Sequence, residues 1–233
     1  MTTLLGRART RYEVAPATVA LAVYLVLAAV RISGAYNIPV MVLSMALTPL
    51  ALLAVPRQLW VSVGICPSRT TPRLVAGTVI VVASYAVTVV ASVAAFGDGQ
   101  DDWLTWIPKL FGNLVPGPVP VRAAAMLLCL TLLVPLVEEV CYRGVLFDAA
   151  ERRLGPFGAV VATAALWAAV HLGDYGLNPF FPSVIAGSLT SVFVMGLGLG
   201  ICRLLTGSVL ACVIAQGVGN LALYGWLLAQ YGL

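Results

Sequence analysis

The stretch VRAAAMLLCLTLLVPLVEEVCYRGVLF, residues 121–147, decides the fold of this 233-residue chain. It is mostly apolar over more than the roughly 20 residues that a helix needs to cross a bilayer. Further apolar runs of this kind lie at 14–33, 38–56, 74–96, 156–172, 183–203 and 207–229. The sequence therefore predicts an all-α polytopic membrane helix bundle of about seven transmembrane helices.

Composition supports a membrane protein and excludes a soluble domain. Hydrophobic residues make up 61% of the chain and charged residues 9%, whereas roughly a quarter of a soluble domain is charged. The apolar residues form long runs instead of alternating, which favours helices over a barrel. The 13 basic residues are scattered beside apolar runs, which argues against a nucleic-acid partner. The five cysteines show no C-x-x-C spacing, so we expect neither a disulfide framework nor a cysteine metal cluster.

The distribution of basic residues predicts the orientation. Most of them fall on one side of the predicted spans, namely Arg7, Arg9, Arg11, Arg57, Arg69, Arg73, Arg152, Arg153 and Arg203. Arg31, Lys109 and Arg122 fall on the other. The positive-inside rule then predicts a cytoplasmic N-terminus and an external C-terminus, in a multi-pass protein of the plasma membrane. A signal peptide would also fit Arg7 to Arg11 before the run 14–30, but a first membrane anchor is favoured.

The longest loop, about 97–120, is expected to lie on the outer membrane surface. It contains three aspartates and several Pro and Gly residues. Trp103 and Trp106 would anchor it at the interface, where tryptophan is enriched. Asp174, further along the chain, is likewise expected at the outer surface.

Two adjacent glutamates and an arginine interrupt the fourth predicted span. Placing a carboxylate inside a bilayer costs on the order of 2.5–3.5 kcal/mol of free energy, so we expect these residues to have a specific role. Glu139 and Arg143 are four residues apart and share a helix face, so they can pair. Glu138 is turned about 100° away, which leaves it available as a general base.

The fifth and last predicted spans carry further polar residues at a similar depth. His171, the only histidine, closes LWAAVHL, and Gln216 and Asn220 share one face of VIAQGVGNLAL. With Glu138, they lie about 10 to 15 residues, or roughly 15–23 Å, from the cytoplasmic helix ends. Gly217 and Gly219 would let a neighbouring helix or a substrate backbone come close.

These motifs, in this order, resemble the CPBP family of CAAX proteases and bacteriocin-processing enzymes, also called the Abi family. The resemblance rests on E-E-x-x-x-R, an aromatic residue (Trp167) four positions before His171, the final x-x-x-N, GVLF after Arg143 and the glycine-rich stretch VFVMGLGLGICRLLTGSVLA. It covers about residues 121–224. The chain would then comprise an N-terminal three-helix membrane region, 1–120, and a catalytic core of four helices, 121–233.

The resemblance implies an intramembrane endopeptidase acting on a membrane-tethered peptide, or on a prenylated one as in some family members. Glu138 and His171 would activate a water, and Glu139 with Arg143 would hold the site. Asn220 and Gln216 would face the oxyanion. The family usually has histidine at the position of Gln216. Glutamine can replace it as a hydrogen-bond donor but not as a metal ligand, so zinc is possible but disfavoured and no cofactor is expected.

Alternative interpretations remain for the same residues. Glu139 and Arg143 could be only a structural clasp, and Gln216 and Asn220 could simply join helices. The whole chain could be a catalytically silent scaffold or a bacteriocin-immunity protein that retains the family fold. A transporter that uses Glu138 as a proton relay is disfavoured, because the sequence has no inverted repeat.

Overall fold

The computed structural model describes the backbone of residues 2–35 and 37–232, and the side chains of residues 18–35, 37–53 and 55–232. The side chains of Arg7, Arg9 and Arg11, used to predict orientation, lie outside the described set. Within the described backbone there are helices and no strand, apart from one isolated bridge between Leu177 and Phe180. The prediction of an all-α polytopic bundle is confirmed.

Long helices build the bundle, and short helical segments join them. In chain order the α-helices are α1 (Thr2–Ser33), α2 (Ile38–Leu47), α3 (Thr71–Phe96), α4 (Trp106–Leu114), α5 (Val119–Leu128), α6 (Val134–Glu139), α7 (Phe147–Val170), α8 (Pro182–Thr206) and α9 (Val209–Tyr231). Shorter 3-10 segments are η1 (Thr48–Ala54), η2 (Arg57–Leu59), η3 (Trp103–Thr105) and η6 (His171–Gly173), and two π-helical segments, η4 (Cys129–Leu133) and η5 (Val140–Leu146), flank α6.

Among the residues that the structure describes, four helical stretches are long and apolar enough to cross a membrane: Thr71–Phe96, Val119–Gly173, Pro182–Thr206 and Val209–Tyr231. The second is 55 residues long and contains two of the predicted spans. The chain turns at Gly155, whose φ of 72° is positive, a backbone conformation that glycine adopts without steric cost. Two shorter apolar helices cover Thr18–Ser33 and Ile38–Leu53. The count of seven spans and the cytoplasmic N-terminus stay predictions.

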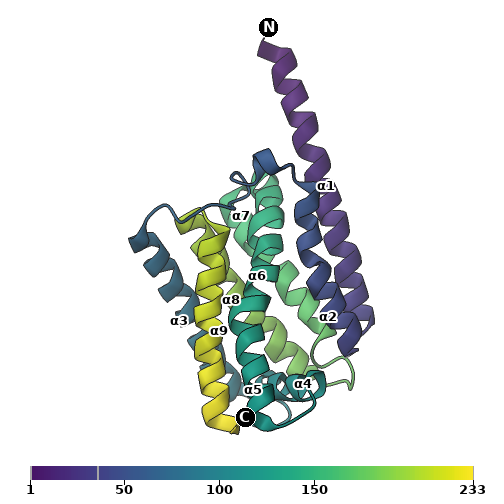
Figure 1. Cartoon of the computed structure of the whole chain (residues 1–233), viewed down its shortest axis with the longest axis vertical. Helices are drawn as coiled ribbons and strands as arrows, with labels where there is room; N and C mark the ends of the chain where they lie inside the picture. Colours follow the sequence, from purple (N-terminus) through teal and green to yellow (C-terminus); the bar gives the residue numbers. More distant parts are fainter. Residues whose placement is uncertain (1, 36, 233) are drawn as a thin grey trace.

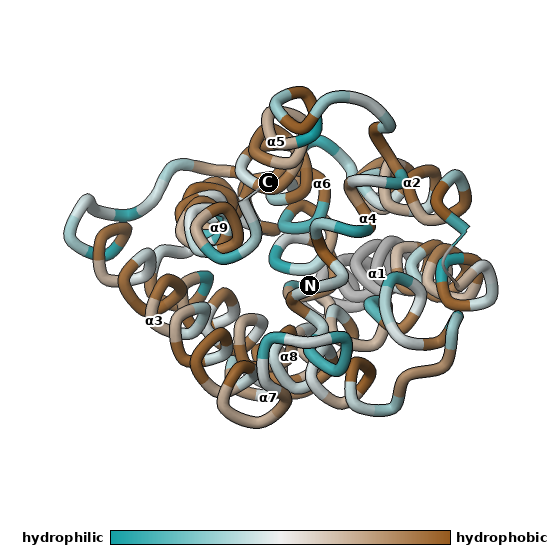
Figure 2. The backbone as a smooth tube through the Cα atoms, turned by 90° about the horizontal axis from the view of Figure 1, so that it is seen from below, coloured by the Kyte–Doolittle hydropathy of each residue, from teal (hydrophilic) through white to brown (hydrophobic). Residues whose placement is uncertain are grey.

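The arrangement of the bundle places apolar side chains on its outside. α1 begins and α9 ends at opposite ends of the bundle (Figure 1). Seen from below, α3 and α9 carry long brown stretches, the colour of hydrophobic residues (Figure 2). Large apolar side chains on α3 point outward, among them Val75, Val79, Val87 and Val90. An outer surface of this kind suits contact with lipid instead of water.

Helix α8 lies inside the bundle and packs against α3 and α7. Its glycines allow this close packing. A Cβ atom at Gly196 would lie 2.9 Å from the Cα of Ala164 on α7, closer than real side chains approach. Small residues of this kind are how membrane helices bring their backbones together.

The loop between α3 and α5 differs from its prediction. Trp103 and Trp106 are buried in the bundle and do not anchor an exposed segment at the interface. Trp103 donates a hydrogen bond to Ser191 of α8 (3.1 Å), and Trp106 donates one to the carbonyl of Gln100 (3.0 Å). The preceding Asp102 is fully buried, and burial raises the pKa of its carboxyl despite hydrogen bonds from Ser92 and the Leu104 amide. The loop therefore closes one end of the bundle.

Candidate active site

Glu139 and Arg143 form the predicted pair. The Arg143 Nη1 donates to Glu139 Oε1 at 2.7 Å, and both side chains are fully buried. Arg143 also donates to the carbonyl of Gly196 on α8 (3.1 Å), and its guanidinium lies 4.8 Å from the ring centre of Trp167 on α7. One arginine thus joins the glutamate segment to two neighbouring helices, which fixes the direction in which the segment faces.

Glu138 faces another helix, as its position in the sequence predicted. Its Oε2 accepts a hydrogen bond of 3.0 Å from the Nε2 of Gln216 on α9, and both side chains are buried. The carboxylate is therefore hydrogen-bonded, not free of partners. Gln216 Oε1 is buried with no hydrogen-bond partner among the described residues. The amide at the position where the family usually has histidine thus contacts the predicted general base directly.

His171 begins η6, directly after the end of α7, and is nearly as many residues from Gly155 as Glu138 is. The turn at Gly155 therefore returns the chain to the depth of the glutamates. His171 Nδ1 is 2.8 Å from the carbonyl of Trp167. Because a carbonyl only accepts hydrogen bonds, Nδ1 carries the ring proton, and Nε2 is left as the basic nitrogen.

Asp174 and Arg31 add an ion pair that the sequence did not reveal. Asp174 was expected at the outer surface, but it is buried and forms a two-pronged pair with Arg31 of α1. The Arg31 Nε lies 2.8 Å from Asp174 Oδ1. The Oδ2 of the same carboxylate is 4.0 Å from His171 Nε2. Arg31, counted above as a topology marker, thus links α1 to the segment that carries the histidine.

A cavity of about 70 Å³ joins the predicted residues. Glu138, His171, Gln216 and Asn220 all line it. Its volume exceeds the roughly 10–15 Å³ that one water molecule needs. Side chains that the sequence had not singled out for this site also line it, namely Tyr85 of α3, Trp103 of η3, Ile107 of α4 and Tyr175.

Asn220 is held at the cavity by the neighbouring helix. Its Nδ2 donates to the carbonyl of Leu130 at 2.7 Å. The nearby Gly217 allows this approach, because a Cβ there would lie 2.6 Å from the carbonyl oxygen of Thr131. A Cβ at Gly219 would lie 3.1 Å from the ring of Tyr85. The two glycines therefore bring neighbouring helices close to α9, one of the two uses expected for them.

The side chains around the cavity do not match a zinc site of the usual kind. A catalytic zinc normally takes three protein ligands from His, Cys or carboxylate side chains. Among the described side chains, no group of three or more His, Cys, Asp or Glu residues is placed to hold a metal ion. Gln216 faces the cavity where a second imidazole would be needed.

Fold and cavity together define a class: a multi-pass helical membrane protein with a small cavity between its helices, lined by apolar side chains and by Glu138, His171, Gln216 and Asn220. Residues 120–222 match the family model described as type II CAAX prenyl endopeptidase Rce1-like. The resemblance to the CPBP family drawn from the motifs is confirmed over these residues. Searches of curated proteins and of solved structures give no match.

Proposed function

We propose that this protein is an intramembrane endopeptidase that hydrolyses a peptide bond of a membrane-tethered or prenylated peptide. One observation carries the proposal: Glu138 and His171 line the same buried cavity, which has room for water. The family match over residues 120–222 supports peptide-bond hydrolysis as the type of reaction. We further propose the plasma membrane as the location of the enzyme.

The reaction begins with a water held between Glu138 and His171. These groups take a proton from the water as its oxygen attacks the scissile carbonyl carbon. The electrons of the carbonyl double bond move to its oxygen, which becomes the oxyanion of a tetrahedral intermediate. When the intermediate collapses, the carbon–nitrogen bond breaks and the leaving amine receives the proton. The products are an amine and a carboxylic acid, and the acid then releases its remaining proton to become a carboxylate.

Gln216 and Asn220 stabilise the oxyanion in this proposal. Each side-chain nitrogen has two hydrogens and uses one of them on Glu138 or the Leu130 carbonyl. The second hydrogen of each amide is the proposed donor to the oxyanion. Removing one such donor from a site that excludes water costs about a hundredfold to a thousandfold in rate.

Two further groups support His171 and the glutamates. Asp174, 4.0 Å from His171 Nε2, stabilises the imidazolium that forms when the ring accepts the proton. Arg143 holds Glu139 and packs on Trp167, which keeps the glutamate segment facing the cavity. No step uses a metal ion, so the proposal predicts that chelators leave the rate unchanged.

A cleavage assay on the full chain in liposomes tests the proposal. The substrates are a peptide ending in a farnesylated CAAX sequence, the same peptide without the lipid, and membrane-anchored peptides of varied sequence. We expect Glu138→Gln and His171→Ala each to lower cleavage about a hundredfold or more. Glu151→Gln, an exposed glutamate of α7, is the matched control and keeps the wild-type rate. Cleavage at the wild-type rate by Glu138→Gln would refute the proposed role of this residue.

The second candidate is a catalytically silent membrane scaffold or bacteriocin-immunity protein. The observation that favours this candidate is the hydrogen bond from Gln216 to Glu138, which occupies one oxygen of the proposed general base. The variant Gln216→His separates the two functions. The enzyme keeps or gains activity with histidine there, whereas a scaffold cleaves none of the peptides in either form.

A further inference from the structure

A second pocket, of about 550 Å³, opens between α4 and α5. α4 contributes Lys109, Phe111 and Gly112 to its wall, and α5 contributes Val119, Arg122 and Met126. It lies at the end of the bundle where α9 ends (Figure 1). None of the residues given for its lining also lines the catalytic cavity. The pocket is therefore a separate feature of the molecule.

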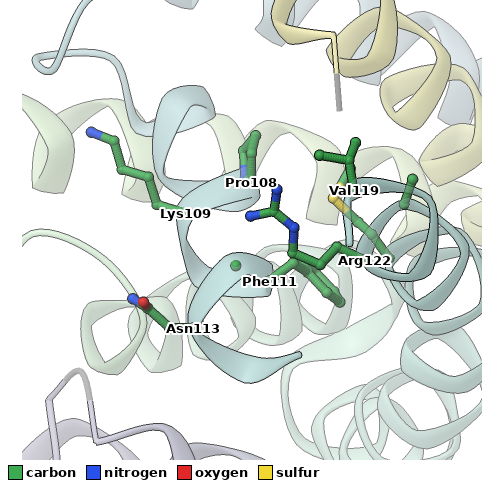
Figure 3. A pocket seen from close by; sticks show the side chains of 9 residues that line it. Pro108, Lys109, Phe111, Asn113, Val119 and Arg122 are labelled. Carbon is green, nitrogen blue, oxygen red and sulfur yellow. The ribbon is translucent and has the colours of Figure 1, made fainter. Parts of the chain in front are cut away.

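Arg122 supplies a positive charge to this pocket, and the described structure gives it no ion pair. Its side chain reaches from α5 toward α4 (Figure 3). The Nε is buried and has no hydrogen-bond partner among the described residues. A Cβ at Gly112 would lie only 3.3 Å from Arg122 Nη1, so glycine keeps room for the guanidinium. A buried donor of this kind is costly unless a ligand satisfies it.

Lys109 adds a second, exposed positive charge to the pocket. Its side chain is exposed and its Nζ lies 5.1 Å from the ring centre of Trp106. Among the described residues, none that lines the pocket is acidic. The pocket therefore favours a negatively charged group.

The remaining surface of the pocket is apolar and continues into the lipid-facing side of α5. Phe111 and Met126 are buried beside the pocket. Val119, Val121 and Leu128 of α5 are exposed, as are side chains further along the same helix. A ligand with an anionic head and apolar tails would satisfy both surfaces, whereas a small free anion would contact only the charged one.

We propose that this pocket binds the phosphate headgroup of an anionic membrane lipid, with the acyl chains lying along α5. Arg122 donates to the phosphate from the pocket wall, and Lys109 contributes its exposed charge. Arginine in a fixed position suits phosphate because its planar group presents several donors at once. Basic pockets between membrane helices recognise anionic lipids in this way.

Lipid binding to the purified full chain in detergent tests the proposal without any activity assay. The probes are phosphatidylglycerol, phosphatidylcholine and inorganic phosphate. Retained lipid is measured by native mass spectrometry, and the melting temperature is recorded in parallel. We expect phosphatidylglycerol to bind more tightly than phosphatidylcholine. Arg122→Gln weakens its binding about tenfold and Lys109→Gln about fivefold.

Arg153→Gln is the matched control, because it removes one exposed positive charge beside the Gly155 turn. It keeps the wild-type affinity for phosphatidylglycerol. Three results would overturn the proposal: wild-type affinity in Arg122→Gln, equal binding of the two lipids, or an equal rise in melting temperature with inorganic phosphate alone. If Arg122→Gln does not fold, lipid binding is measured in Lys109→Gln instead, because this side chain is exposed. Unchanged binding of phosphatidylglycerol in that variant contradicts the proposal.

Discussion

At the scale of single residues, the sequence identified the polar groups but not all of their partners. Glu139 and Arg143 are predictable because helix periodicity places residues four apart on one face, and the structure pairs them. The Arg31–Asp174 pair was not predictable, since its members are 143 residues apart. Only packing of α1 against η6 brings them together. Tyr85 was missed for the same reason, because a single tyrosine in an apolar helix carries no local signal.

The buried pair predicts a large effect on stability. Asp174→Asn removes the charge that compensates Arg31 and leaves a buried cation, which costs about 3–5 kcal/mol of unfolding free energy. Asp148→Asn is the control. It breaks the more exposed pair with Arg152 on α7, where the loss is at most about 1 kcal/mol. Denaturant unfolding in detergent micelles measures the loss of unfolding free energy in both variants. Equal losses would show that the Arg31–Asp174 pair is not buried.

At the scale of helices, the cavity depends on how closely α7, α8 and α9 approach their neighbours. The apolar runs predicted where these helices lie, but hydropathy does not say which helix packs on which. The turn at Gly155 and the close contact at Gly196 supply that information. The loop before α5 was misjudged because tryptophan suits both an interface and a buried contact. Its burial here follows from hydrogen bonds to Ser191 and Gln100.

Two glycine-to-alanine substitutions are expected to change stability in opposite directions, one at the α7–α8 contact and one on α9 away from any neighbour. Gly196→Ala places a methyl group 2.9 Å from the Ala164 backbone, and overpacking of this kind costs about 1–3 kcal/mol. Gly225→Ala on α9 meets no atom within 4 Å and stabilises the helix by about 0.5–1 kcal/mol. Melting temperatures of the two variants measure the difference. A higher melting temperature in Gly196→Ala would contradict the close packing.

At the scale of the whole molecule, the bundle has apolar sides and a small cavity between its helices into which a few polar side chains face. A soluble protein could not expose this outer surface without aggregating. α3 packs against α8 and α9 and contributes Tyr85 to the cavity, so the predicted N-terminal region takes part in the site. The division into residues 1–120 and 121–233 stays a prediction.

The orientation of the bundle is tested with reporters fused after Leu233. The basic residues predict a C-terminus outside the cytoplasm. A C-terminal alkaline phosphatase, which is active only outside, should be active in bacterial cells, and a C-terminal green fluorescent protein should be dark. The opposite pattern would contradict the predicted orientation.

The central claim is that Glu138 and His171 act together on one water in the shared cavity. A double-mutant cycle on kcat/KM measures this most directly, using Glu138→Gln, His171→Ala and the combined variant with the best-cleaved peptide. If both groups serve the same proton transfer, the double variant loses little more than either single variant. Losses that multiply would mean that the two residues act independently, and would contradict the claim.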